Sequence, residues 1–233
     1  MTYLTFNGRD SKDFGVYISG SGTFDAPKRD TEAVAVPGRN GVLLFDNGRY
    51  ENLTITYPAF ISQDFAENFD AFKAFMLSQS GYHRLEDTYH PDEYRLASYE
   101  GPLAPEVGAI NRYGHFDIVF NCKPQRFLKS GEETVEITQD MAIINPTLYA
   151  AAPLIRAYGV GTFYIGSYGM EITSADGYTD IDCDIQDAFK GATNCNGNIR
   201  LLSNEFPKIE AGKNNITISG ITRLEILPRW FTI

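Results

Sequence analysis

Helical periodicity is almost absent from this chain, and that absence constrains its fold more than any other feature. Only residues 64–79 space their apolar side chains three and four apart, as one face of a helix requires. This stripe consists of Phe65, Phe69, Phe72 and Met76. Asp64 and Glu67 have the spacing of a capping box, and Gly81 follows the expected end. The sequence therefore predicts one helix whose aromatic face packs on a sheet.

The remaining apolar residues fall in short runs separated by turn residues, a pattern that predicts β-strands. We expect strands at residues 3–6, 16–18, 31–36, 83–86, 94–97, 115–122, 134–138, 154–158, 162–165, 170–173, 179–185, 199–202, 215–219 and 223–227. The run 115–122 alternates most regularly, and Pro124 is expected to end its ladder because proline has no N–H to donate. The predicted fold class is mainly β.

Residues 36–60 predict a long β-hairpin. Segments 42–45 and 49–60 have strand-like composition, and Asp46-Asn47-Gly48 lies between them. Asparagine and glycine tolerate positive φ, so this tripeptide suits a tight turn. The hairpin carries no catalytic group, which favours a role in assembly over a role in an enzyme.

A change in composition near residues 130–153 predicts a domain boundary. This region holds Asn145-Pro146 and a run of small residues at 150–153. We place the domains at residues 1–135 and 136–233. The first holds the single predicted helix, and the second is expected to be a β-sandwich or jelly roll, because its strands are short and separated by frequent glycines.

Charge and cysteine content exclude several classes of protein. The 233 residues hold 20 Lys and Arg against 30 Asp and Glu, a formal net charge of -10. Sequence-specific nucleic-acid binding and adhesion to anionic lipid both need a cationic surface, so neither is expected. No stretch approaches the roughly 20 apolar residues of a membrane span, and residues 1–5 lack the features of a signal peptide. The odd count of three cysteines, without a C-x-x-C pair, makes a disulfide framework or a zinc site improbable, and Cys122 and Cys183 are expected to be buried.

Two clusters of acidic residues could form a metal or catalytic site. Residues 83–93 gather potential metal ligands, namely His83, Glu86, Asp87, His90, Asp92 and Glu93. Their spacing matches no known helical zinc motif, so a polar hairpin loop is the favoured interpretation and metal binding the alternative. Asp180, Asp182 and Asp184 alternate along one strand and predict a solvated acidic face, with calcium binding or glycoside hydrolysis as alternatives. We expect no catalytic residue, cofactor or metal, and we expect Trp230 to be a buried or interface anchor.

Short segments spread over nearly the whole chain carry a further signal. They lie at residues 6–8, 14–17, 36–41, 46–50, 85–87, 89–92, 94–97, 120–127, 145–147 and 226–230. In this order and spacing they resemble the distal tail (Dit) proteins of long-tailed, non-contractile phages, the siphophages. The resemblance implies a structural virion protein made in the host cytoplasm and located at the tail tip. It also implies a β-sandwich-like, ring-forming domain with one α-helix at 1–135 and a galectin-like β-sandwich domain at 136–233.

The same resemblance implies partners. A hexameric ring of this chain would join the tail-tube protein to the tail-associated tip protein of the baseplate and could carry a receptor-binding protein. Within it, the predicted hairpin is the candidate contact between subunits, through Arg39, Asp46, Asn47, Gly48, Arg49 and Tyr50. Arg39 and Arg49 are expected to pair with acids across the joint. The alternatives are that the hairpin only covers its own core, and that the chain is a carbohydrate- or host-receptor-binding module.

Overall fold

The computed structural model describes residues 1–20, 23–108 and 111–233. Contacts divide the chain into two compact units, Met1–Arg126 with Ile233, and Phe127–Thr232. The expected boundary at 135/136 lies inside the second unit. The segment after Arg126 belongs there because Leu128 N–H donates to the Trp230 carbonyl at 2.8 Å.

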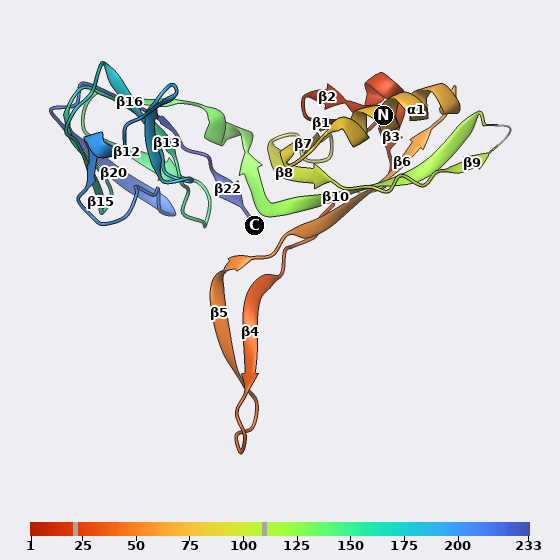
Figure 1. Ribbon diagram of the computed structural model, residues 1–233, viewed down its shortest axis with the longest axis horizontal. Helices are drawn as coiled ribbons and strands as arrows, with labels where there is room; N and C mark the ends of the chain where they lie inside the picture. Colours follow the sequence, from red (N-terminus) through yellow and green to blue (C-terminus); the bar gives the residue numbers. More distant parts are fainter. Residues whose placement is uncertain (21–22, 109–110) are drawn as a thin grey trace. The chain divides into compact units, whose positions relative to one another are not determined.

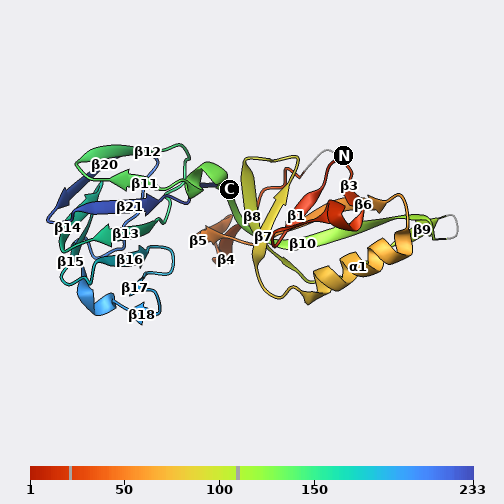
Figure 2. The same ribbon diagram turned by 90° about the horizontal axis from the view of Figure 1, so that it is seen from above.

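The first unit is built on one antiparallel sheet with a helix against it (Figures 1 and 2). Its elements are β1 (Leu4–Phe6), β2 (Arg9–Asp10), η1 (Ser11–Phe14), β3 (Val16–Ile18), β4 (Arg29–Ala35), β5 (Val42–Tyr50), β6 (Leu53–Ile61), α1 (Phe65–Ser78), β7 (His83–Asp87), β8 (Glu93–Tyr99), β9 (Glu106–Gly108) and β10 (Tyr113–Leu128). The sheet order is β2-β1-β7-β8-β10-β6-β3, with β9 paired to β10. Strands β4 and β5 pair only with each other in the described part of the chain.

Helix α1 supplies the aromatic face that its periodicity predicts. All four stripe residues are buried, and the Phe69 and Phe72 rings lie 5.1 and 6.0 Å from the Phe116 ring of β10. The capping box at its start is wrong. Asp64 adopts a left-handed backbone (φ 50°) and its side chain makes no capping hydrogen bond, because side-chain capping needs an extended residue at that position.

Strand β10 confirms the alternation predicted for 115–122 and corrects its end. Phe116, Ile118, Phe120 and Cys122 are buried. The ladder with β6 ends at the Cys122–Leu53 pair, but the extended strand continues through Pro124 to Leu128. Proline removes one donor from a strand without forcing a turn, so it ended one pairing and not the strand.

The hairpin predicted around Asp46-Asn47-Gly48 is wrong in its turn. Strand β5 runs through that tripeptide and pairs with β4, so the hairpin turn lies at residues 36–41. The following strand β6 pairs with β10 and β3 instead. The register jumps between the pairs Arg29–Tyr50 and Thr31–Asp46, which leaves extra residues in β5. Gly48, at φ 70°, therefore serves a bulge, where positive φ is also needed.

The second unit is a two-sheet sandwich. Its elements are η2 (Lys129–Glu132), β11 (Val135–Ile137), β12 (Met141–Asn145), β13 (Leu154–Tyr158), β14 (Gly161–Ile165), β15 (Tyr168–Ile172), β16 (Tyr178–Asp182), β17 (Asp187–Lys190), β18 (Thr193–Asn194), η3 (Asn196–Asn198), β19 (Ile199–Leu201), β20 (Gly212–Ser219), β21 (Arg223–Leu227) and β22 (Phe231–Thr232). The sheets run β11-β21-β13-β16-β17-β18 and β12-β20-β14-β15-β19. One apolar core joins residues of both, including Ile155, Ile181, Phe163 and Ile216, as alternating inward side chains of two packed sheets do.

Most strands predicted in this half are present, and β12, β17, β18 and β22 were not anticipated. The mainly β fold class with one α-helix in the described residues is confirmed. In the part of the chain that the structure describes, no helix has both the length and the apolarity that a membrane crossing requires.

Candidate functional site

Strands β4 and β5 form a two-stranded ribbon (Figure 1), and this ribbon has exposed apolar side chains. Cross-strand pairing and the two-residue period place Val42 and Leu44 on one face and Leu43 and Phe45 on the other. Exposed fractions are 58% for Val42, 65% for Leu44 and 54% for Phe45. Four consecutive apolar residues, most of them exposed, are a liability in a soluble chain unless another surface covers them. We call residues 33–35 and 42–45 the apolar ribbon.

Most of the predicted contact residues lie together at the other end of the ribbon, in the bulge. Asp46 accepts the Arg29 Nε–H at 2.5 Å and the Gly48 N–H at 2.8 Å. Tyr50 accepts from Arg29 through its hydroxyl at 3.0 Å. The Gly48 N–H, followed by the Arg29 guanidinium, lowers the pKa of Asp46. This network therefore holds the bulge of β5 against β4.

Arg49, which we predicted to pair with an acid across a subunit joint, has an acidic partner within the single chain. Its Nε–H donates to Asp30 of the same chain at 2.6 Å, and Asn47 donates to the other Asp30 oxygen at 3.0 Å. Hydrogen bonds from Asn47 and Arg49 lower the pKa of Asp30. Arg49 thus already has an acidic partner, whereas Arg39 lies in the turn at 36–41, away from the bulge. The structure brings Asp46, Asn47, Gly48, Arg49 and Tyr50 together and leaves Arg39 apart.

The acidic residues at 83–93 have partners within the β7–β8 hairpin and its neighbours. Asp87 accepts from Tyr57 Oη at 2.7 Å, from the N–H groups of Tyr89 and His90 at 2.9 Å each, and contacts His90 Nδ1 at 3.2 Å. Glu93 pairs with Arg126 at 3.4 Å. Within residues 1–20, 23–108 and 111–233, no three His, Cys, Asp or Glu side chains are arranged to hold a metal ion.

The solvated acidic face predicted for Asp180, Asp182 and Asp184 is wrong. Asp180 is buried and binds the Arg156 guanidinium through both oxygens, at 2.6 and 3.0 Å. Asp182 binds Arg229 in the same two-pronged way, at 2.7 and 2.8 Å. Asp184 lies beyond the end of β16 and is exposed. Two of the three carboxylates are therefore structural, since each is held by a planar guanidinium.

The remaining candidates are buried. Trp230 is 5% exposed and packs in the core of the second unit, as predicted for an anchor, so it offers no open ring for a sugar. Cys122 and Cys183 are buried, as predicted, and Cys195 is buried as well; all three are free. The apolar ribbon is the feature that the sequence reasoning missed. The signal that could have found it was the unbroken apolar run at 42–45, which lacks the alternation of a half-buried strand.

Comparison with known proteins gives one consistent answer. No family model and no curated protein matches the chain. Among solved structures, the chain matches the Dit (gp 19.1) protein of phage SPP1 with a TM-score of 0.79 and 10% identity over 100% of both chains. That protein is described as a paradigm of the hub adsorption apparatus in phages that infect Gram-positive bacteria.

A protein of the phage p2 baseplate in its activated conformation matches in two structures. The structure with strontium gives a TM-score of 0.54, and the structure with calcium gives 0.53. Each match has 12% identity and covers 97% of both chains. At such low identity the likeness concerns the fold, which is conserved over the whole length. The chain therefore has the mainly β fold of a phage distal tail protein.

Proposed function

We propose that this chain is a structural subunit of the tail hub of a long-tailed phage. The observation that carries the proposal is its full-length likeness to SPP1 Dit at a TM-score of 0.79. The acidic groups weighed as alternative catalytic or metal sites do not support a competing function, because Asp180 and Asp182 are bound by arginines and Asp87 is hydrogen-bonded to Tyr57. The protein acts by shape and not by turnover, at the tip of the virion tail after synthesis in the host cytoplasm.

The assembly we propose is a closed hexameric ring in which one surface of each subunit meets a different surface of the next. The first unit forms the ring. One side of the ring binds the tail-tube protein, and the other binds the tail-associated tip protein, with a receptor-binding protein held by the second unit. These partners follow from the proposed role of the ring.

The apolar ribbon is the contact between subunits that we propose. Both of its faces are exposed in the single chain, so a neighbour can cover either one. Full burial of a leucine side chain is worth about 1.5–3 kcal/mol, and Leu44 is 65% exposed. Its burial in a joint therefore contributes about 1–2 kcal/mol, which changes the association constant of one joint by roughly tenfold.

The test replaces Leu44 by lysine and compares it with Leu77→Lys, a control on α1 whose leucine is also 65% exposed. Mass measurement and electron microscopy should find rings of six copies of the 26.0 kDa chain in wild type and in Leu77→Lys. The Leu44→Lys protein should stay monomeric at concentrations at which the control assembles. Virions carrying each variant provide the second readout, because a ring that needs the tail tube as template forms only there.

Equal ring formation by both variants would show that the ribbon is not the joint. Tail tips that lack a ring of this protein, or that hold it at another multiplicity, would overturn the hexamer itself.

A further inference from the structure

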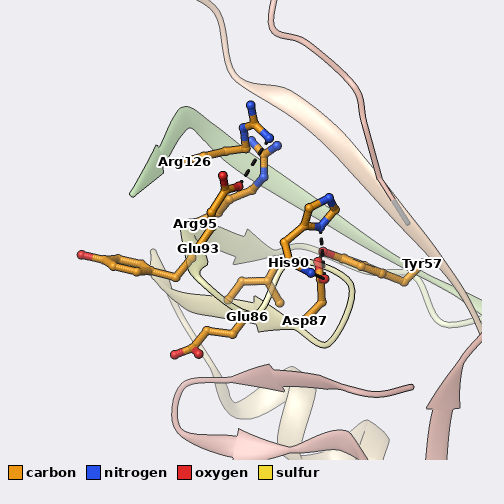
Figure 3. A pocket seen from close by; sticks show the side chains of 9 residues that line it. Tyr57, Glu86, Asp87, His90, Glu93, Arg95 and Arg126 are labelled. Atoms are coloured by element: carbon orange, nitrogen blue, oxygen red, sulfur yellow. Dashed lines mark hydrogen bonds and ion pairs between the residues drawn. The ribbon is translucent and has the colours of Figure 1, made fainter. Parts of the chain in front are cut away.

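A small cavity opens between the β7–β8 hairpin, β6 and the far part of β10 (Figure 3). The volume that the centre of a water molecule can occupy in this cavity is about 20 Å³. The charged and polar groups on its walls include Tyr57, Glu86, Asp87, His90, Glu93, Arg95 and Arg126. This size admits water or one small ion, and it excludes a sugar ring or a nucleotide.

Arg95 is the wall residue whose guanidinium has a buried nitrogen without a hydrogen-bond partner among the described residues. Its side chain comes from β8 and the residue is only 8% exposed. Its Nη1 atom is buried and has no hydrogen-bond partner among the described residues. Burial lowers the pKa of Arg95, and the nearby charge of Arg126 acts in the same direction. An uncompensated buried cation is costly, so the fold tolerates one only where something else satisfies it.

The acids on the walls do not fill this role. Asp87 already has contacts from the Tyr57 hydroxyl, the N–H groups of Tyr89 and His90, and the His90 ring. Glu93 is paired with Arg126 at 3.4 Å, and Glu86, the third acid on the walls, is paired with Arg84. The acceptor that Arg95 lacks therefore has to come from outside the chain.

Charge and geometry narrow the class of that acceptor. Arg95 and Arg126 carry two positive charges, while Glu86, Asp87 and Glu93 carry three negative ones. Glu86 is already paired with Arg84. A multiply charged anion would be repelled by these acids. A carboxylate is a small monoanion whose two oxygens match the planar donor pattern of a guanidinium. We propose that this cavity binds one small free carboxylate, with Arg95 as its principal ligand and Arg126 as the second cation. The site lies within the first unit and is separate from the apolar ribbon.

Acetate is the probe, and the unassembled full-length chain is the sample. Thermal unfolding is followed at pH 7 while sodium acetate replaces sodium chloride at constant ionic strength. A ligand that binds only the folded state raises the midpoint of unfolding, increasingly as its concentration exceeds the dissociation constant. The wild-type midpoint should rise with acetate, Arg95→Met should lose the rise, and Arg112→Met, which removes an exposed arginine elsewhere, should keep it.

A second measurement covers a variant that fails to fold. Saturation-transfer NMR on the wild-type protein should show magnetisation passing to the acetate methyl group, and excess formate, a smaller carboxylate, should displace it. A wild-type midpoint that is the same in acetate and chloride, or a wild type without transfer to acetate, overturns the proposal. A response that survives in Arg95→Met also overturns it. Neither assay depends on ring formation, so this site and the hub function fail or stand separately.

Discussion

The ion pair between Asp182 and Arg229 provides the sharpest test of how the second unit is held together. We consider Asp182→Asn, which keeps the size of the side chain and removes its charge. Arg229 then loses the opposite charge and one of its two hydrogen bonds to this side chain, now 2.7 and 2.8 Å long. The side chains are only 25% and 13% exposed for Arg229 and Asp182, so water replaces little of the lost interaction.

The expected cost follows from these contacts. A hydrogen bond to a charged group is worth about 1.5–3 kcal/mol, and the asparagine oxygen still accepts one bond. We therefore expect a loss of about 2 kcal/mol in the free energy of unfolding. For a unit of this size, about 4 °C in the unfolding midpoint corresponds to 1 kcal/mol, which gives a shift of about 8 °C.

The assay uses Trp230, the only tryptophan of the chain, which is buried in the same unit. Its fluorescence reports the unfolding of the second unit by itself. Asp184→Asn is the matched control, because Asp184 is a nearby exposed aspartate whose side chain makes no bond to Arg229. The control should stay within about 0.5 kcal/mol of wild type.

The dependence on pH is a second readout of the same pair. Burial opposes the ionisation of Asp182, but Arg229 and the N–H groups of Asp184 and Ile185 outweigh it and lower the pKa below its ordinary 3.8. The pair therefore contributes its full stability above pH 3.8 and loses it as the pH falls through the lower pKa of the folded protein. The difference in the free energy of unfolding between wild type and Asp182→Asn should therefore disappear at acidic pH. Equal stabilities for the two asparagine variants, or a gap that persists below that pKa, would refute the reasoning.

Three further predictions concern packing. Phe72→Ala should destabilise the first unit by about 3–5 kcal/mol in calorimetry, because Phe72 is fully buried, while Leu77→Ala on the exposed side of the same helix should cost under about 1 kcal/mol. Gly131→Ala should lower the unfolding midpoint seen by fluorescence, because a Cβ there would lie 2.4 Å from a backbone nitrogen, whereas Gly197→Ala meets nothing within 4 Å and should be nearly neutral. Burial raises the pKa of Cys122 to about 12, so mass spectrometry should find it unlabelled by a thiol reagent at pH 8 until the protein is unfolded, and rapid labelling of the native protein would contradict this burial.

The predictions that were correct depend on one segment of the chain, and those that were wrong depend on which segments pair. The helix stripe and the alternation of 115–122 were predictable because period and burial depend on one segment at a time. The turn at Asp46-Asn47-Gly48 was not, since a bulge and a hairpin turn both need positive φ and only the partner strand distinguishes them. Strand β5 pairs with β4, which precedes it in the sequence, and not with β6, which follows it.

The acidic row shows the same limit for side chains. Alternation correctly placed Asp180 and Asp182 on one face of a strand, but it could not show that Arg156 and Arg229 lie against them. Those arginines come from β13 and from the end of the chain, and a sequence pattern carries no information on such distant pairs.

The sequence by itself determined that this is a mainly β chain with one packed helix, buried thiols and a buried tryptophan, because those properties follow from local period and residue type. Only the tertiary structure decided which strands pair, which acids are neutralised, and which apolar residues remain uncovered. Leu44 and Phe72 are both apolar residues in regular elements, yet one is exposed and the other is buried. That difference depends on what the rest of the chain brings against each of them.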